Sequence, residues 1–236
     1  STHCSGLKKV TPRAIFISRS VDQIGDQLRQ FEARGGKLYA QSLIAFEEIK
    51  NETAPTCDVV FFSSIRAADY FLTNHAKPKA LFACAGLETA RKLSERYQIA
   101  CDFVSEEAGN PMNAAVAFQS WLKERTVLFP LSEQSLHTYT SLIPTPQKAV
   151  LYVYRTLTNP MVIPACDYYV FSSPSNVRAF LEVNVLPDSA RCIAWGHSTE
   201  STLIAQQITV HHCLKEGSIQ ELDAYFQDHV FNSFDQ

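Results

Sequence analysis

The chain of 236 residues lacks the features by which several large classes of protein are recognised. It has no run of about 18 apolar residues, so no segment predicts a membrane-spanning helix. Its 21 Lys and Arg stand against 24 Asp and Glu, which leaves no surplus of positive charge to attract nucleic acid or an anionic membrane. We therefore expect neither partner, and any anionic ligand must be bound by local groups.

Export signals and disulfide patterns are missing as well. Residues 1–11 lack the basic-then-apolar order of a signal peptide. The seven cysteines are odd in number, form no CxxC pair and fall partly within apolar runs, which favours reduced, buried thiols. These features predict a cytoplasmic protein, and we expect a monomer.

Common catalytic and metal-binding motifs are absent too. There is no GxSxG, GxxxxGK[ST], GxGxxG or HExxH, so hydrolase, kinase and dehydrogenase interpretations lose support. The triplet His211, His212, Cys213 suggests metal ligands, but adjacent residues of a strand point to opposite faces. We expect no metal site.

What the chain does contain is an internal repeat. Two pairs of segments match with offsets of 109 and 110 residues, and a third pair, of an apolar strand leading into a helix, matches more weakly. The pairs are 57–64 with 166–173, 82–93 with 192–203, and 14–20 with 127–133. Two copies of one strand–helix series are therefore expected.

Short, continuously apolar runs predict ten strands, with helices between most of them. Such runs are typical of parallel strands covered on both faces, and alternating strands and helices imply right-handed crossovers and open, doubly wound α/β sheets. The predicted strands are 14–17, 38–43, 59–62, 80–84, 100–103, 127–129, 148–153, 168–171, 191–194 and 209–212.

Serine residues mark the expected helix starts, at Ser20, Ser63 or Ser64, Ser132, and Ser172 or Ser173. Residues 156–164 contain two prolines and no periodicity, which makes them the best candidate linker. Gly35 and Gly36 are the second candidate. Two chain crossings would then join two domains.

Four strand-to-helix turns are rich in small donors. In parallel sheets, ligands bind beyond the carboxyl ends of the strands, where helix N-termini present free N–H groups, and these residues suit an anion with many carboxylates or phosphates. Helix capping alone would also select them, and both interpretations remain open. The residues are Ser63, Ser64, Gly86, Thr89, Ser172, Ser173, Ser175, Gly196, His197, Ser198 and Thr199.

An ordered set of motifs runs along nearly the whole chain. The motifs are Ser18 and Arg19, FFSS at 61–64, AGLETA at 85–90, VYRT at 153–156, FSSPSNVRAF at 171–180 and WGHST at 195–199. In order and spacing, this set resembles the uroporphyrinogen-III synthases. The resemblance implies two flavodoxin-like, doubly wound parallel-sheet domains joined by two extended crossings, with the first strand–helix unit packed against the C-terminal half. Domain one would be 1–37 and 157–236 and domain two 38–156, with a cleft between them.

The resemblance also implies a reaction. The family's substrate is hydroxymethylbilane, a linear tetrapyrrole with eight carboxylates, which loses its terminal hydroxyl as water and closes with inversion of ring D through a spiro intermediate. No cofactor or metal is implied. Tyr154 matches the family's tyrosine in the second crossing, where it would donate a proton to the departing hydroxyl. The alternative is a strand aromatic that only packs on a neighbour.

Other assignments follow from the resemblance less directly. Arg19, and also Arg155, Arg178 and Arg191, are candidate cations for substrate carboxylates, or else solvated residues at element ends. Leu131, His197 and Ser198 depart from the family pattern. Two other functions remain open: a non-catalytic, hinged two-domain module that binds an anionic metabolite, and a degenerate paralogue with a regulatory role.

Overall fold

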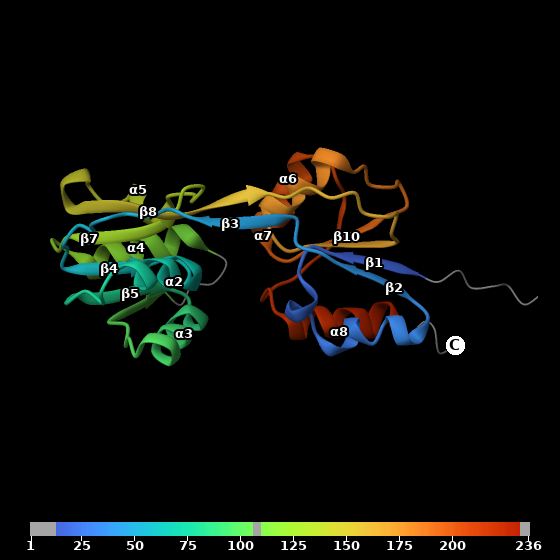
Figure 1. The fold of residues 1–236 in the computed structure, drawn as a ribbon, viewed down its shortest axis with the longest axis horizontal. Coiled ribbons are helices and arrows are strands. Elements are labelled where there is room, and N and C mark those ends of the chain that lie inside the picture. The colour runs from blue at the N-terminus through green and yellow to red at the C-terminus, as the bar shows by residue number, and fades with distance from the viewer. Residues whose placement is uncertain (1–12, 106–109, 232–236) are drawn as a thin grey trace, which may run out of the picture. The chain divides into compact units, whose positions relative to one another are not determined.

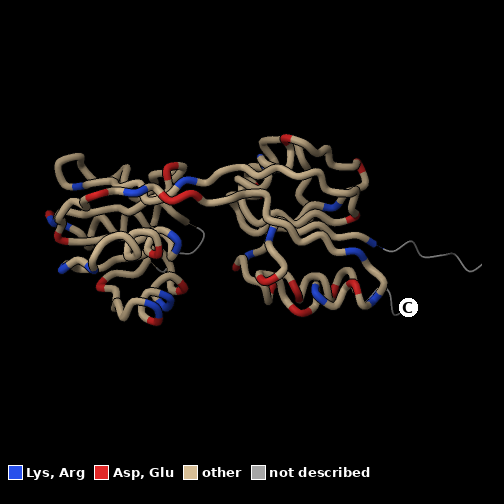
Figure 2. The backbone as a smooth tube through the Cα atoms, in the orientation of Figure 1, with Lys and Arg blue, Asp and Glu red and all other residues tan. Residues whose placement is uncertain are grey.

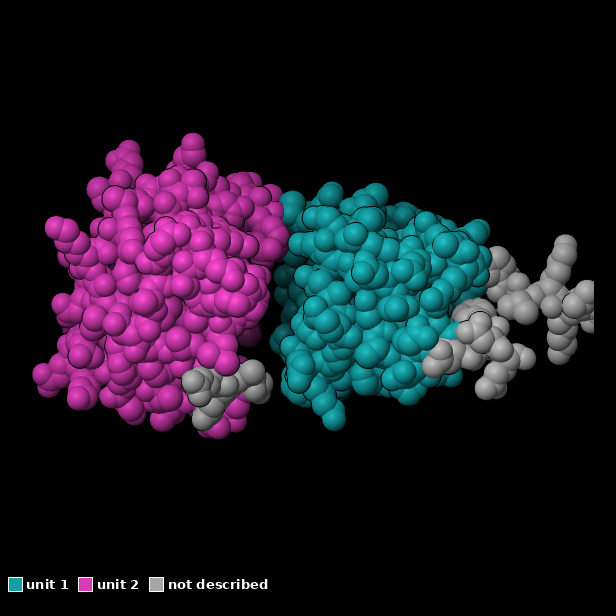
Figure 3. All heavy atoms as spheres, turned by 90° about the horizontal axis from the view of Figure 1, so that it is seen from below, with its two compact units in different colours: residues 1–45, 158–236 teal, residues 46–157 magenta. Residues whose placement is uncertain are grey.

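The computed structural model describes residues 13–105 and 110–231. The chain divides into two compact units, one drawn from Ser1–Ala45 and Thr158–Gln236 and the other from Phe46–Leu157 (Figure 3). Each unit is built on one of two sheets, which confirms the predicted α/β class. None of the helices in the described ranges combines the length and apolarity that a membrane span requires.

Sheet A, in the first unit, has the strand order β11-β10-β9-β1-β2, and all its pairings are parallel. Counted along the chain within the unit, this is the flavodoxin order 2-1-3-4-5. The strands are β1 (Ala14–Ile17), β2 (Lys37–Ala40), β9 (Tyr168–Phe171), β10 (Arg191–Ala194) and β11 (Val210–Cys213).

Helices cover both faces of sheet A, so its central strands are apolar on both faces (Figure 1). Phe16 packs with Phe180 on one face, beneath α6 and α7, whereas Ile15 packs with Leu28 and Phe226 on the other, beneath α1 and α8. The helices are α1 (Asp26–Arg29), α6 (Pro174–Val183), α7 (His197–Ala205) and α8 (Ile219–His229).

Sheet B, in the second unit, has the order β3-β8-β7-β4-β5-β6. The pairings β4–β5, β4–β7, β5–β6 and β7–β8 are parallel, with α2 and α3 on one face and α4 and α5 on the other. The elements are β3 (Ile44–Glu48), β4 (Val59–Phe62), α2 (Ile65–Asn74), β5 (Leu81–Ala85), α3 (Leu87–Tyr97), β6 (Phe103–Ser105), α4 (Pro111–Leu122), β7 (Val127–Ser132), α5 (Thr138–Ser141) and β8 (Lys148–Thr158).

The two sheets exchange parts of the sequence repeat. Strands β4, β5 and β6 correspond to β9, β10 and β11, and β7 and β8 correspond to β1 and β2, so each sheet combines the first strands of one copy with the last strands of the other. An equivalent hydrogen bond joins the two copies in each sheet. In sheet B, Thr126 N donates to Asp58 Oδ2 at 2.9 Å, and in sheet A, Ala14 N donates to Asp167 Oδ2 at 2.8 Å. This exchange accounts for the offset repeat.

Strands β3 and β8 carry the chain between the units. Ile49 N donates to Val153 O at 3.0 Å and Asn159 N donates to Leu43 O at 2.7 Å, so residue numbers rise on one segment as they fall on the other and the pairing is antiparallel. Charged positions are frequent on these two strands, unlike the core strands of sheet A (Figure 2).

The crossings differ in place from the sequence prediction. Gly35 and Gly36 are not a linker: Gly35 ends a 3-10 helix (Glu32–Arg34), and β2 begins at Lys37 and pairs with β1. The first unit therefore runs to Ala45, beyond the boundary expected after Lys37. The second crossing remains strand until Thr158, because β8 extends into the predicted 156–164 linker.

Two of the four serine helix starts are correct. Ser64 Oγ accepts from Ala67 N and Ser173 Oγ accepts from Asn176 N, both at 3.2 Å. Ser132 was expected to begin a helix but is the last residue of β7, and α5 begins only at Thr138. Ser20 precedes a 3-10 helix (Val21–Gln23), and its hydroxyl donates to Gln23 Oε1 instead of capping the backbone.

Candidate functional site

The predicted binding residues of the first unit gather at one edge of sheet A. Strands β1, β9 and β10 are parallel neighbours, so their carboxyl ends meet at the same edge. We call these residues, together with Ser18 of the first motif, edge A: Ser18, Arg19, Ser172, Ser173, Ser175, Gly196, His197, Ser198 and Thr199.

Hydrogen bonds between Ser18 and Ser172 fix the ends of β1 and β9 in edge A. Ser172 N donates to Ser18 Oγ at 2.8 Å, and Ser172 Oγ donates to Ser18 O at 2.9 Å. Ser18 is buried. The sequence marked it only as part of the first motif and did not predict its bonds to Ser172. Because the Ser172 hydroxyl proton is already committed, Ser172 positions the edge and is a poor donor for a carboxylate.

Ser173 has the opposite chemistry. Its oxygen accepts from Asn176 N at 3.2 Å and from Asn176 Nδ2 at 2.9 Å, so its own hydroxyl hydrogen stays available. A capping serine can therefore also donate to a bound anion. In the second unit, Ser64 caps α2 in the same way: its Oγ accepts from a backbone N–H, and its hydroxyl hydrogen stays available. Capping and ligand binding are compatible roles at these two positions.

Asn176 supports edge A and was missed as a site residue by the sequence prediction. The residue is 2% exposed. Its Oδ1 accepts from Leu43 N at 2.8 Å while its Nδ2 donates to Ser173 Oγ. The corresponding residue of the other copy is Ala67, so the repeat gave no signal for this role.

Helix α7 presents its positive end at edge A. Glu200 N is the first of its N–H groups with an intrahelical bond, to Gly196 O at 3.0 Å, so the preceding N–H groups point outward as anion donors. Gly196 is extended (φ −169°, ψ −179°), and a Cβ built there would meet nothing within 4 Å. The space beside these donors is therefore open.

Thr199, in the first turn of α7, is 2% exposed. Within the described ranges its hydroxyl has no hydrogen-bond partner, and it is not among the side-chain oxygens sealed from solvent. Buried hydroxyls normally have a partner, so this one is available to a ligand. Ser198 and His197 are exposed on the same turn.

We predict that Thr199→Val lowers the affinity for the anionic substrate about 10-fold, because one hydrogen bond to a charged group is lost. The thermal midpoint should stay unchanged, since valine keeps the shape and no hydrogen bond to the described chain is broken. Michaelis constants and melting curves of the two proteins measure both effects. A lowered midpoint with normal affinity would make Thr199 a structural residue only.

The candidate arginines divide between two ends of the sheets. Arg19 Cζ lies 4.3 Å from the centre of the Trp195 ring, which holds this cation at edge A. Arg191 is the first residue of β10 and lines a hollow of about 380 Å³ at the opposite, amino end of the strands. Arg178 is exposed on α6, and Arg155 forms ion pairs with Glu47 and Glu133. Arg191 is therefore misplaced for a ligand at edge A.

The second unit has a matching edge at the carboxyl ends of β4, β5 and β7, beside the part of β8 that pairs with the end of β7. We call it edge B: Ser63, Ser64, Gly86, Thr89 and Tyr154. Tyr154 belongs here because it is paired with Ser132, the last residue of β7. Gly86 starts α3 with φ +85° and ψ 148°, a conformation open mainly to glycine.

The two glycines at the helix starts should respond differently to alanine. Gly86→Ala should lower the free energy of unfolding by about 1 to 3 kcal/mol, because its positive φ strains any other residue. Gly196→Ala should leave stability unchanged but weaken substrate binding, because the methyl group fills the open space beside α7. Urea unfolding and Michaelis constants test the pair. Equal destabilisation of both variants, or normal binding by Gly196→Ala, would contradict this view of the edges.

A β-bulge aims Tyr154. Between β7 and β8, Leu131 pairs with Tyr152 and Ser132 with Tyr154, so β8 contains one extra residue, Val153. A bulge reverses the face of the side chains that follow it. Tyr152 accordingly lies beside His137, its hydroxyl 3.3 Å from Nε2, whereas Tyr154 packs in the core cluster beneath α2.

The Tyr154 ring is held between two aromatic rings. It meets Phe46 edge-on with centroids 5.8 Å apart and stacks on Tyr70 at 5.2 Å, and the residue is 8% exposed. Its hydroxyl has no hydrogen-bond partner within the described ranges and is not sealed from solvent. The ring packing predicted as the alternative is present, and the hydroxyl is still available to a ligand.

Arg66 is a cation near Tyr154 that the sequence prediction missed. Its Cζ lies 3.7 Å from the centre of the Phe46 ring, the same ring that packs on Tyr154. It is exposed in the first turn of α2, and no acidic side chain of the described ranges pairs with it. Its place two residues after the FFSS motif was the available signal.

Comparisons with known proteins agree on one family. A family model described as uroporphyrinogen-III synthase HemD matches residues 26–222. The solved uroporphyrinogen-III synthetase of Helicobacter pylori is similar with a TM-score of 0.66 and 16% identity, covering 92% of this chain and 100% of that chain. A mutant uroporphyrinogen III synthase of Thermus thermophilus gives 0.62 and 14%, covering 91% and 98%. At these identities the likeness shows the fold. No curated protein matches the chain.

Proposed function

Because this chain belongs to the uroporphyrinogen-III synthase family, we propose that it is a cyclising lyase of haem biosynthesis that closes hydroxymethylbilane to uroporphyrinogen III. The observation that carries this proposal is the pair of matched edges A and B. Each places helix N-termini, available hydroxyls and one arginine at the carboxyl ends of parallel strands. A substrate with eight carboxylates needs many such donors.

The donors hold the substrate through its carboxylates. Helix starts contribute N–H groups and positive dipole ends, Ser64 and Ser173 contribute hydroxyl hydrogens, and Arg19 and Arg66 contribute cations. Binding holds the flexible substrate in the conformation that closes with ring inversion. The entropy cost of reaching that conformation is therefore no longer part of the activation barrier. Binding geometry, more than bond chemistry, is what the protein must supply.

Water loss requires one proton. Electron release from a pyrrole nitrogen breaks the bond between carbon and the terminal hydroxyl, and the oxygen leaves as water once it takes a proton. The Tyr154 phenol is the donor we propose, because its hydroxyl makes no hydrogen bond within the described ranges while its ring is fixed by Phe46 and Tyr70. The freed carbon bonds to the substituted α-carbon of ring D and gives the spiro intermediate. The bond between that α-carbon and its original bridging carbon then breaks, and the bridging carbon closes on the other α-carbon of the inverted ring. This last closure releases one proton, which restores the phenol.

Supplying hydroxymethylbilane to the purified chain tests this function. The proposal predicts that uroporphyrinogen III accumulates, whereas a protein-free sample yields the type I isomer by spontaneous closure. A chain that binds the substrate without catalysis would leave type I as the product.

A further inference from the structure

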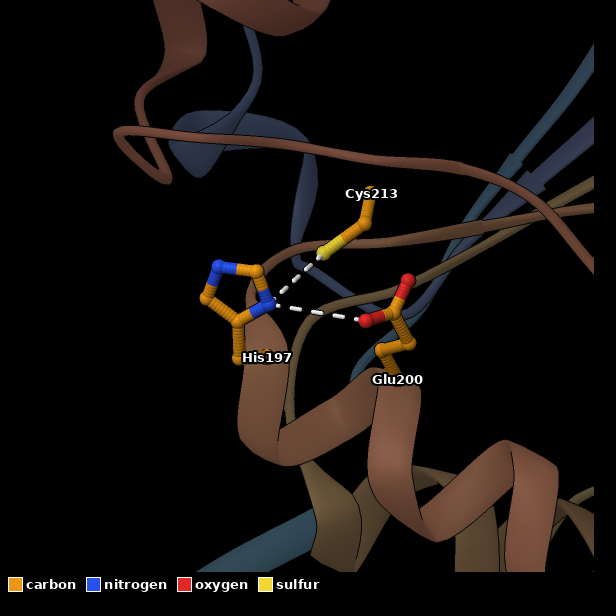
Figure 4. Close-up of side chains that lie close together, drawn as sticks. All are labelled: His197, Glu200 and Cys213. Carbon is orange, nitrogen blue, oxygen red and sulfur yellow. Dashed lines mark hydrogen bonds and ion pairs between the residues drawn. The ribbon is translucent and has the colours of Figure 1, made fainter. Parts of the chain in front are cut away.

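Three side chains of different ligand type converge next to α7. His197 is the first residue of the helix, Glu200 lies one turn later, and Cys213 ends the neighbouring strand β11 (Figure 4). His197 Nδ1 lies 3.5 Å from Glu200 Oε1 and 4.0 Å from Cys213 Sγ. The three ligand atoms all lie within 4.8 Å of one another.

These separations fit a single tetrahedral ion. With metal–nitrogen and metal–oxygen bonds of about 2.0 to 2.1 Å and a metal–sulfur bond of about 2.3 Å, tetrahedral ligands lie about 3.4 Å apart for nitrogen and oxygen and about 3.6 Å for nitrogen and sulfur. The two separations from His197 Nδ1, 3.5 and 4.0 Å, require shifts of only a few tenths of an ångström. Glu200 and Cys213, whose ligand atoms lie within 4.8 Å of each other, must approach by up to about 1.2 Å. The exposed His197 side chain and the partly exposed Glu200 side chain can make these movements.

We propose that His197, Glu200 and Cys213 form a binding site for a divalent ion of the zinc class, with a fourth position left for water or an exogenous ligand. One nitrogen, one oxygen and one sulfur ligand with an open position is the arrangement that Zn²⁺ accepts and that Mg²⁺ and Ca²⁺, which require oxygen ligands, do not. The proposal departs from the expectation, drawn from the sequence, that the chain holds no metal site.

Binding exchanges one proton for the ion. The Cys213 thiol must lose its hydrogen to become a thiolate ligand, while neutral His197 and ionised Glu200 bind without losing one. A cysteine thiol holds its proton at neutral pH, and the ion replaces that hydrogen on binding. Zn²⁺ and the protein therefore give the complex and about one released proton.

The adjacent histidines do not join this site. His211 Nδ1 accepts from Cys192 N at 3.1 Å, and His212 stacks on Tyr225 with ring centroids 4.2 Å apart. Both rings are therefore engaged elsewhere, and His212 also points to the opposite face of the strand from Cys213. The histidine near Cys213 is instead His197 of α7, sixteen positions earlier in the chain.

Cobalt and zinc titrations of the full chain test the site without any assay of turnover. We expect one Co²⁺ to bind and to give a thiolate-to-cobalt charge-transfer band with the intense visible bands of tetrahedral coordination. Zn²⁺ should displace it and release about one proton, measured calorimetrically in buffers of different ionisation enthalpy. Excess Mg²⁺ should not compete.

Substitutions separate this site from the other thiols. Cys213→Ser should remove the charge-transfer band, and His197→Ala should weaken Zn²⁺ binding by more than the roughly 10- to 100-fold that loss of an outer-shell partner costs. Cys57→Ser, at another half-buried thiol, should leave both properties unchanged. His197 is largely exposed, so His197→Ala retains the fold even if Cys213→Ser does not.

Two results would overturn the assignment. One is an octahedral cobalt spectrum without a thiolate band. The other is a Zn²⁺ affinity that neither His197→Ala nor Glu200→Gln changes, since both substitutions remove a proposed ligand.

Discussion

Tyr154→Phe is expected to lower the turnover of hydroxymethylbilane about 100-fold, while the product remains the type III isomer. The phenol is the one proposed proton donor, but the pyrrole nitrogen already assists hydroxyl departure, which places the loss at the lower end of the range for general acids. The isomer is kept because ring orientation depends on the donors of edges A and B, which this substitution leaves in place.

Folding should not obscure the Tyr154→Phe result. Phenylalanine keeps the ring that packs on Phe46 and Tyr70, and no hydrogen bond to the described chain is lost. Tyr152→Phe is the matched control, since it removes a phenol from the same strand on the opposite face. Initial rates and product isomers measured for both variants check the prediction. A Tyr154→Phe rate equal to that of Tyr152→Phe would leave packing as the only role of Tyr154.

Asn176→Ala is expected to lower the free energy of unfolding by about 3 kcal/mol. The substitution leaves the Leu43 N–H, on a residue with 0% exposure, without its acceptor and removes the amide donor to Ser173. A buried donor that loses its partner bears the full cost of its desolvation. Urea unfolding of the purified variant gives the change directly.

Ser175→Ala provides the control for Asn176→Ala, because it lies in the same first turn of α6 and is half-buried. It should change the unfolding free energy by only about 0.5 kcal/mol or less, the size expected for a surface substitution. If the two variants unfold at the same urea concentration, the bonds of Asn176 do not hold edge A together.

Most residues of the two edges could be predicted from sequence because their positions depend on the local order of strand, turn and helix. Where an apolar strand ends and a helix begins, Ser64, Gly86, Ser173 and Gly196 follow from the chain itself, and parallel pairing then brings neighbouring strand ends together. The repeat supported the strand series independently, and the exchange of strands between the sheets, which the resemblance implied, is visible in the pairing of β1 with β9.

The features that the sequence prediction missed depend on contacts between distant segments. The bulge that aims Tyr154 is a property of the register between β7 and β8, and a single extra residue leaves no mark in the strand pattern. Ser18 and Asn176 act through partners more than a hundred residues away. Gly35 and Gly36 looked like a linker, but pairing of β2 with β1 moved the crossing further along the chain.

The most direct test of the proposed synthase activity is the isomer ratio as a function of protein concentration. Spontaneous closure of hydroxymethylbilane to the type I isomer proceeds at a rate that does not depend on the protein. The rate of closure with ring inversion should rise in proportion to the protein concentration. We predict that the fraction of type III grows from none towards completeness as the chain is titrated into a fixed concentration of substrate. A ratio that stays at type I while the substrate binds would contradict the proposed synthase activity.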